Sequence, residues 1–317
     1  MQIEQLVEQI DQVPVMAPVY ARLVRMIRDT DVSAQELSEA ISGDPSLTAQ
    51  VLRVVNSAAY GARTRARLPR QVASVSQAVL LLGFDTIAHQ VLGHARRALK
   101  DPAAQMGPLD FRAFWQHSVA VAAGARVLAC HVGQLDEEAL FVAGLLHDIG
   151  RVLLAQHMPD ALERAIARAW RTRVSLYEAE REVLGFTHCR LGEQVAMRWD
   201  LPDLIVDAVA FHHEPDVTER HNLETRIVEA ADTLARAMSL GSSGDGRVGP
   251  IPAQTREMLE LEADEVEPLM EAIRTGFNET SAYVLGVLRN DKGTGGVATM
   301  KNDVKQPAKT ADTVSGQ

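Results

Sequence analysis

The spacing of apolar residues is the feature that most constrains the fold of this chain. Along most of its 317 residues, apolar side chains recur at intervals of three and four, and alternation of apolar and polar residues is nearly absent. The first pattern places apolar side chains on one face of a helix, whereas half-buried strands require the second. Hydrophobic residues make up 46% of the sequence and charged residues 23%, which is ordinary for a globular protein. We therefore predict an all-α fold.

Local signals mark two helix boundaries near the N-terminus. Ser33 and Glu36 have the spacing of a capping box, and Gly43 offers a C-terminal stop for a short helix. Asp44 followed by Pro45 has the pattern of an N-cap and a first helical position. Two helices are therefore expected to meet at a tight Gly-Asp-Pro turn.

Breaks in the helical pattern divide the chain into three parts and a tail. The connection DPAAQMGPLD separates an N-terminal helical bundle at about 13–100 from a second bundle at about 111–214, in which we expect about five helices. Residues 215–288 are expected to form a C-terminal helical extension that completes the second bundle, interrupted by the flexible loop GSSGDGRVGP. Residues 289–317 are too polar to bury a core, so we expect a disordered tail.

The charge balance and the cysteines limit the partners and the compartment. Lys and Arg total 32 against 42 Asp and Glu, and this net charge of −10 disfavours DNA binding. We find no apolar run of about 18 residues and no basic flank before an apolar stretch, so neither a membrane span nor a secretion signal is expected. Cys130 and Cys189 form no CxxC pair, which fits two free thiols in or near the core of a cytoplasmic protein.

One charged pair lies within an unusually apolar segment. In FVAGLLHDIGRVLL, His147 and Asp148 fall in the middle of a predicted helix whose other positions are mostly apolar. An ionised carboxylate in such a setting is costly unless it is paired, hydrogen-bonded or bound to a cation. Asp148 therefore needs a partner, and either a metal ion or an imidazolium would serve.

Further histidines and an aspartate lie at helical positions among apolar or small residues. In LPDLIVDAVAFHHEP, the inward stripe of a helix opened by Pro202 continues to His212, with His213 about 100° around the helix. Imidazoles and carboxylates without thiolate suit Fe, Mn, Zn or Ni, and a shared aspartate can bridge two ions about 3.5–4 Å apart. The alternative is that these histidines are core residues that pack and form hydrogen bonds. The candidate set of metal ligands is His117, His147, Asp148, His188, His212, His213 and Asp232.

The order of His117, then His147 and Asp148, and finally Asp232 resembles that of the HD superfamily of metal-dependent phosphohydrolases. The chain is most similar to the HDOD family from about Val13 to Glu214, through VPVMAP, GDPSLTAQVLRVVNSAAYG, SVSQAVLLLG, FWQHS, AGLLHDIGR, GFTHCRLGEQVAMRWDLP and the HH pair. This resemblance implies an N-terminal helical bundle packed on an HD-like bundle, used in bacterial signal transduction.

A wider similarity to the HD-GYP cyclic-di-GMP phosphodiesterases implies roles for individual residues. All seven candidate positions match positions of metal ligands in those enzymes. The similarity implies that Asp148 of this chain would bridge two metals. By the same resemblance, His117, His147 and Asp232 would bind one ion, and His188, His212 and His213 the other. Arg151, a candidate phosphate contact, stands where those enzymes have a lysine, and HHEPDV is not followed by their GYP stretch.

Three functional hypotheses follow. The leading one is a bacterial signal-transduction output protein that contacts signalling proteins in trans and carries a His/Asp metal site. The second is a metal-dependent phosphohydrolase, or phosphodiesterase, acting on nucleotides or cyclic dinucleotides, and the third is a switch that senses a metal or ligand. We expect Arg63, Arg65, Arg67 and Arg70 to lie in a loop that either is solvated or binds a phosphate-bearing ligand or an acidic partner. The oligomeric state and the role of the last helices, as a cap or a dimer contact, stay open.

Overall fold

The computed structural model describes residues 3–10, 13, 17–28, 32–57, 71–98 and 107–285, and these residues fold into helices joined by short connections. None of the residues in these ranges belongs to a strand. The predicted all-α fold is therefore confirmed. The arginine-rich loop expected at 63–70 and the tail expected at 289–317 lie outside the described residues.

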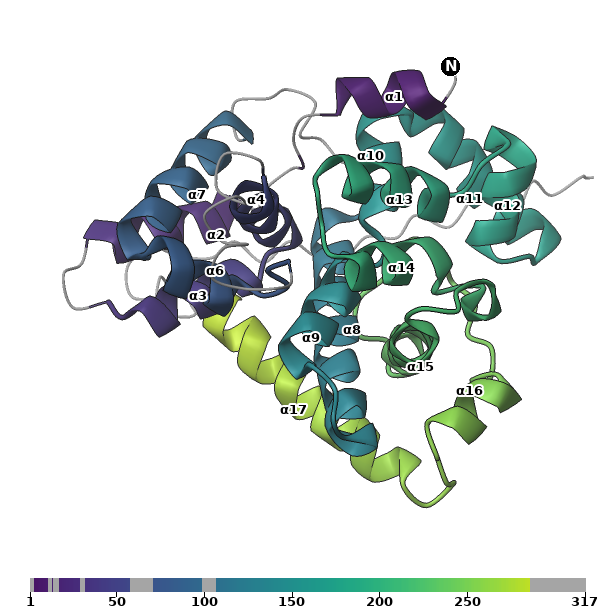
Figure 1. The fold of residues 1–317 in the computed structure, drawn as a ribbon. Coiled ribbons are helices and arrows are strands. Elements are labelled where there is room, and N and C mark those ends of the chain that lie inside the picture. Colours follow the sequence, from purple (N-terminus) through teal and green to yellow (C-terminus); the bar gives the residue numbers. More distant parts are fainter. Residues whose placement is uncertain are drawn as a thin grey trace, which may run out of the picture.

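An N-terminal group of helices lies on one side of the molecule (Figure 1). Its helix boundaries follow the expected capping signals. Ser33 and Glu36 form the complete capping box of α3, and the Leu47 amide donates to the Asp44 carboxylate over 3.0 Å at the start of α4. The helices of this group are α2 (Ala17–Arg28), α3 (Ala34–Ser42), α4 (Pro45–Asn56), α6 (Val75–Leu82) and α7 (Phe84–Ala98).

The second group is divided more finely than the sequence indicated. Between residues 111 and 213 the chain forms seven helices where about five were expected. The apolar periodicity continues across two breaks, before α10 and before α11, so it gave no sign of them; Pro159 opens α11. The seven are α8 (Phe111–Val132), α9 (Glu137–Leu146), α10 (Ile149–His157), α11 (Pro159–Thr172), α12 (Leu176–Leu184), α13 (His188–Arg198) and α14 (Asp203–Phe211).

The C-terminal helices pack onto both groups. After the short 3-10 helix η2 (Pro215–Val217), α15 (Asn222–Ala237) packs against α8, and α16 (Ala253–Met258) lies beside α15. The long helix α17 (Val266–Leu285) runs along α8 and also contacts α2 and α3, as its diagonal course in Figure 1 shows. At the opposite end of the chain, α1 (Ile3–Gln9) packs on α13.

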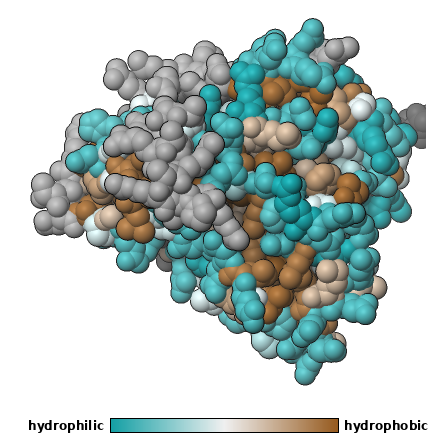
Figure 2. All heavy atoms as spheres, in the orientation of Figure 1, coloured by the Kyte–Doolittle hydropathy of each residue, from teal (hydrophilic) through white to brown (hydrophobic). Residues whose placement is uncertain are grey.

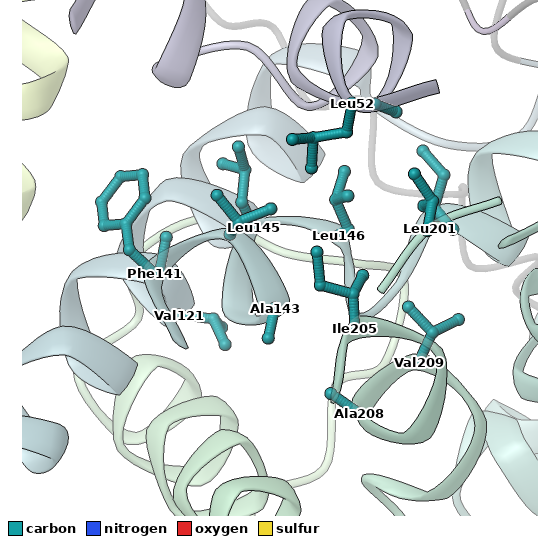
Figure 3. Close-up of a cluster of buried hydrophobic side chains, with 14 of the residues drawn as sticks. Leu52, Val121, Phe141, Ala143, Leu145, Leu146, Leu201, Ile205, Ala208 and Val209 are labelled. Atoms are coloured by element: carbon teal, nitrogen blue, oxygen red, sulfur yellow. The ribbon is translucent and has the colours of Figure 1, made fainter. Parts of the chain in front are cut away.

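The two groups share one buried apolar interface. Leu52 of α4 points toward Leu145 and Leu146 of α9, beside side chains of α14 (Figure 3). All three leucines are at most 1% exposed, so the hydrophobic effect holds α4 against the second group. On the face shown in Figure 2, hydrophilic side chains cover most of the surface and hydrophobic ones gather near the middle.

The glycine- and serine-rich stretch after α15 is a loop, as expected, but it is packed rather than loose. The Ser242 amide donates to the Ala113 carbonyl over 2.8 Å, and the Leu176 amide donates to Asp245 over 3.1 Å. A Cβ on Gly241 would lie 2.3 Å from the main-chain nitrogen of His117, so only glycine allows this approach. Residues 241–247, which we call the 241–247 loop, therefore join α8 to the start of α12.

No single described helix is long and apolar enough to cross a membrane; α6 and the first part of α7 meet the length and composition test only as a pair bent by 120°.

Cys189 is buried and free, as expected, but Cys130 is exposed, which corrects the expectation that both thiols lie in or near the core.

Candidate metal centre

The structure brings the predicted ligand residues together inside the second group of helices. His117 comes from α8, His188 from the first position of α13, His212 from the end of α14, and Asp232 from α15. These side chains and those of His147 and Asp148 belong to residues no more than 4% exposed. His213 is only partly buried and lies at the margin of the cluster.

His147 and Asp148 lie at a helix junction, not in the middle of one helix as expected. Helix α9 ends at Leu146, and α10 begins at Ile149. Asp148 has φ −99° and ψ 16°, which are not helical values, so the main chain changes direction between the two helices. The apolar residues on both sides keep a helical spacing, and the sequence therefore did not reveal the turn.

Asp148 lies at the centre of the cluster. Its Oδ1 is 2.9 Å from His188 Nε2 and 3.6 Å from His212 Nε2. Its Oδ2 is 3.3 Å from His147 Nε2 and accepts a hydrogen bond of 2.8 Å from Arg151 Nη1. His117 Nε2 lies 4.0 Å from the same oxygen. The carboxylate thus faces imidazoles on both sides, as a bridging ligand would.

Three of the histidines are oriented by acceptors on their far side. The Nδ1 atom of His147 is 2.7 Å from the Gly144 carbonyl, and that of His212 is 3.0 Å from the Ala208 carbonyl. The Nδ1 atom of His188 is 2.6 Å from the Glu180 carboxylate. If Nδ1–H donates in each case, the neutral ring presents the Nε2 lone pair to Asp148, and two acceptors then face each other. Either a proton on Nε2 or a metal ion must lie between them.

A second carboxylate closes the other end of the cluster. Asp232 Oδ1 is 3.2 Å from His117 Nε2, and its Oδ2 accepts a hydrogen bond of 2.6 Å from Arg236. Burial alone would raise the pKa of Asp232, but the adjacent His117 ring and the charge of Arg236 hold it below its ordinary value. Asp232 is therefore an anion beside His117.

Protons carry the charge balance in the absence of a metal ion. Burial opposes charge on His212, yet the neighbouring Cys189 and Asp148 raise its pKa to about 10. The pKa of His188 is also raised, against the effects of burial and Arg151, by Cys189 and the carboxylates of Glu180 and Asp148. Burial lowers the pKa of His147. A divalent ion would take the place of the protons on His188 and His212.

Arg151 lies beside the cluster as a buried cation. In addition to Asp148, its Nη1 donates to the Ser243 hydroxyl in the 241–247 loop. Its Nη2 is 3.5 Å from His213 Nε2, and its Nε is 3.6 Å from Glu180. Arg151 is 2% exposed, so in this structure its guanidinium serves protein groups, and contact with a phosphate stays a prediction.

The sequence did not single out Glu180, Cys189 or Ser243. Glu180 is fully buried and accepts from both the amide and the ring of His188. A signal for it was present, because Glu180 interrupts the apolar stripe from Leu176 to Leu184 at a spacing of four. Nothing in the sequence could show that the 241–247 loop folds back and places Ser243 against Arg151.

The donor atoms fall into two groups that could each hold a metal ion. One group consists of His117, His147 and Asp148; the other consists of His188, Cys189, His212 and His213. Both ring nitrogens of His117, Nε2 of His147 and Oδ1 of Asp148 are buried without a hydrogen-bond partner in the structure. Buried polar atoms normally find partners, and a cation bound between one ring nitrogen of His117, Nε2 of His147 and a carboxylate oxygen of Asp148 would provide one. The residues therefore fit a divalent metal.

The sequence of the chain matches a known protein family. The family model for the HDOD domain matches residues 13–215, close to the range expected from the motifs. The chain belongs to this family. The resemblance predicted from the sequence is thus confirmed.

Individual relatives are distant. An uncharacterised protein of Treponema pallidum is 23% identical over 234 residues, covering 73% of this chain and 44% of that protein. Ribonuclease Y of Thermus thermophilus is 34% identical over 137 residues, covering 42% of this chain and 19% of that protein. The chain therefore spans less than half the length of these curated relatives.

Solved structures share the fold. The response regulator MmoQ of Methylococcus capsulatus superposes with a TM-score of 0.63 at 23% identity, covering 83% of this chain and 99% of that one. A virulence factor of Campylobacter jejuni has a TM-score of 0.60 at 18% identity, covering 88% of this chain and all of that one. At these identities the similarity establishes the architecture alone.

Proposed function

We propose that this HDOD protein is a bacterial, cytoplasmic signal-transduction output protein that works through protein contacts and carries a metal at its His/Asp centre. One observation supports this most: the central residues, including Asp148 and Arg151, are at most 4% exposed. Structural metal sites are closed, whereas catalytic sites keep an open position for water or substrate. The description of MmoQ as a response regulator agrees with a role in signalling.

The proposed metal centre is binuclear, with Asp148 bridging two divalent ions of Fe, Mn, Zn or Ni. His117, His147 and Asp232 would serve one ion, and His188, His212 and His213 the other. This donor set of imidazoles and carboxylates suits those metals. Each Nδ1 atom that faces an acceptor would fix its ring toward the ion, as outer hydrogen bonds do in metal sites. The ions would hold α8, α9, α13, α14 and α15 in one arrangement.

A groove between the two groups of helices is the proposed contact surface. It encloses about 770 Å³, and its lining includes Leu80 and the mostly buried Phe141. Leu80 is 84% exposed, the highest exposed fraction among the large apolar side chains of the described residues. The charged residues of the lining are Glu39, Glu138 and Glu279 and one cation, Arg126, so the groove carries a net negative charge. This charge fits an amphipathic helix of a signalling partner with basic residues beside its apolar face.

The alternative function is a metal-dependent phosphodiesterase acting on nucleotides or cyclic dinucleotides. All seven predicted ligand positions are occupied in this sequence, and a ribonuclease is among the similar proteins. Two bound ions would supply an activated water and offset negative charge on phosphate oxygens. Arg151 would then contact the phosphate, provided that it left Asp148.

Activity measurements separate the two functions. Protein purified with its metal is incubated with cyclic di-GMP, 2′,3′-cyclic nucleotides and bis(p-nitrophenyl) phosphate, beside the Asp148→Ala variant. The signalling proposal predicts no turnover above that of the variant. Turnover that disappears with Asp148→Ala would overturn it in favour of the phosphodiesterase.

The groove has its own test. Partner proteins that co-purify with the wild type should be lost with Leu80→Asp and kept with Met197→Asp, a control at another exposed apolar residue. Metal content and melting temperature should stay unchanged in both variants. Equal capture by all three proteins would show that the groove is not the contact surface.

A further inference from the structure

Cys189 lies inside the cluster and has no role in the ligand set that the HD-GYP resemblance implies. Its Sγ is 3.3 Å from His188 Nε2 and 4.0 Å from both ring nitrogens of His212. Cys189 is 2% exposed and lies on α13. The other cysteine, Cys130, is exposed and lies on α8. A thiol thus points at the same place as two imidazole nitrogens.

The spacing of these atoms is that of ligands around one ion. With metal–nitrogen distances of about 2.0–2.1 Å and a metal–sulfur distance of about 2.3 Å, a regular tetrahedron has edges of about 3.3 Å between nitrogens and about 3.6 Å between nitrogen and sulfur. The distance between His188 Nε2 and His212 Nε2 is 3.5 Å, and the two nitrogen–sulfur distances are 3.3 and 4.0 Å. Three corners of a tetrahedral site are therefore already in place.

Asp148 supplies the fourth corner. Its Oδ1 lies 2.9 Å from His188 Nε2 and 3.6 Å from His212 Nε2. The first distance is shorter and the second is longer than the edge of a regular tetrahedron. This buried oxygen faces the two imidazole nitrogens without a hydrogen bond of regular geometry, so it needs a proton or a cation between itself and those nitrogens. The buried carboxylate oxygen is an observation independent of the cysteine, and it points to a bound cation.

His213 is engaged on another side. Its Nε2 is 3.5 Å from Arg151 Nη2, and its ring packs against Tyr177 with ring centroids 4.8 Å apart. An imidazole nitrogen that faces a guanidinium is an acceptor for an arginine and not a free metal ligand. A His213 ring nitrogen and the Cys189 sulfur both lie within 4.8 Å of the His188 and His212 donors, but the Nε2 of His213 faces Arg151.

We propose that Cys189 is a thiolate ligand, which together with His188, His212 and Asp148 forms a tetrahedral site that prefers zinc. This inference rests on the proposed metal centre and changes the nature of one half of it. A thiolate makes the donor set softer and favours Zn²⁺ over Mn²⁺. On binding, the thiol proton is released to solvent. His213 becomes a residue that positions Arg151.

Cobalt is the probe for this site, because a thiolate bound to Co²⁺ gives a charge-transfer absorption band in the near ultraviolet. Protein freed of metal is titrated with Co²⁺. We expect the band in the wild type, its loss in Cys189→Ser, and its retention in His213→Gln and in the control Cys130→Ser. Zinc should displace the cobalt and abolish the band, whereas manganese should not.

The outcomes separate this inference from the proposed function. Bound cobalt without the band, or a band that survives Cys189→Ser, overturns the thiolate ligand and leaves a metal centre of nitrogen and oxygen donors. Absence of any bound cobalt overturns both. If Cys189→Ser does not fold, X-ray absorption of the zinc-loaded wild type decides: a sulfur neighbour at about 2.3 Å supports the thiolate, and a shell of nitrogen and oxygen alone overturns it.

Discussion

The imidazoles around Asp148 are fixed by what they touch on their outer side. His147 and His212 face main-chain carbonyls, but His188 faces the side chain of Glu180, which also accepts the His188 amide over 2.8 Å. A main-chain acceptor cannot be removed by substitution, whereas a side chain can. Glu180 is therefore the residue through which the orientation of a ligand can be tested.

Replacement of Glu180 by glutamine should weaken metal binding without removing a ligand. The neutral amide supplies a weaker acceptor to His188 and no negative charge, and loss of such outer partners lowers metal affinity about 10–100-fold. Competition with a chromophoric chelator measures the affinity. Glu182→Gln is the control, since Glu182 lies on the same helix in an exposed pair with Arg168. Equal affinities of the two variants would contradict the role of Glu180.

Metal binding should release protons at neutral pH. The pKa of His212 is raised to about 10, so the ring is protonated in the metal-free protein, and a metal requires it to be neutral. Metal affinity should therefore rise with pH up to about 10, by about tenfold per pH unit for each proton released. Calorimetry at pH 8 in two buffers of different ionisation enthalpy counts the protons. The count should fall in His212→Gln, and an unchanged count would contradict the assignment.

At the scale of helices, the close contact between α10 and α13 brings the two halves of the centre together. A Cβ on Gly150 would lie 2.0 Å from the His188 carbonyl oxygen, and one on Gly192 would lie 2.6 Å from Val209. Helices α10 and α13 can cross at this distance only because Gly150 lacks a side chain, and Gly192 likewise allows the close approach of α14 to α13. Gly150 follows Asp148 by two residues, and thus the crossing also sets the distance from Asp148 to His188.

Gly150→Ala should destabilise the protein and disturb the centre. The methyl group meets main-chain atoms, which cannot rotate away, so α10 and α13 must separate, at a cost of about 1–3 kcal/mol or more in the free energy of unfolding. Gly276→Ala is the matched control in helix α17. There the nearest atom would be 3.5 Å away, an ordinary contact, and alanine should stabilise the helix by up to about 1 kcal/mol. Chemical denaturation measures both, and equal shifts of the two variants would contradict the close crossing.

Helix boundaries show what local signals can and cannot predict. The capping box at Ser33 and the cap at Asp44 depend on neighbouring residues, and the structure has both. The turn at Asp148 depends on the packing of α9, α10 and α13, and no local residue signals it. For the same reason the packed 241–247 loop was expected to be flexible: glycine and serine mark a loop, but its contacts with α8 and α12 are tertiary.

At the scale of the whole molecule, α17 connects the two groups of helices. It runs along α8 and contacts α2 and α3. Ile273 is fully buried, and its Cδ1 would lie 3.6 Å from a Cβ on Gly124 of α8. The last described helix therefore holds the N-terminal group against the one that carries the centre.

Ile273→Ala should loosen both groups together. Removal of a buried isoleucine side chain to alanine costs about 2–5 kcal/mol in the free energy of unfolding. Hydrogen exchange should report faster exchange of amides in α2 and α3 as well as in α8. Glu271→Ala, an exposed change on the same helix, should leave all of them unaltered. If exchange became faster only in the amides of α8, this result would contradict the connecting role of α17.

The sequence predicted the fold class, the family and the residues that meet in the cluster. Side-chain type and helical phase are enough for that, because a buried carboxylate such as Asp148 requires partners wherever it lies. The sequence could not predict which atoms would meet. The contact of Arg151 with Ser243 joins residues 92 positions apart, and the directions of Cys189 and Glu180 depend on how α12, α13 and α14 pack.

The central claim is that Asp148 bridges metal ions. Elemental analysis of protein purified without chelator or nickel resin, beside the Asp148→Ala variant, tests it most directly, with circular dichroism to show that the variant keeps its helices. We predict about two equivalents of iron, manganese or zinc per chain in the wild type and their loss in the folded variant. A wild type without metal, or equal metal in both proteins, would contradict the account and leave the histidines as core residues.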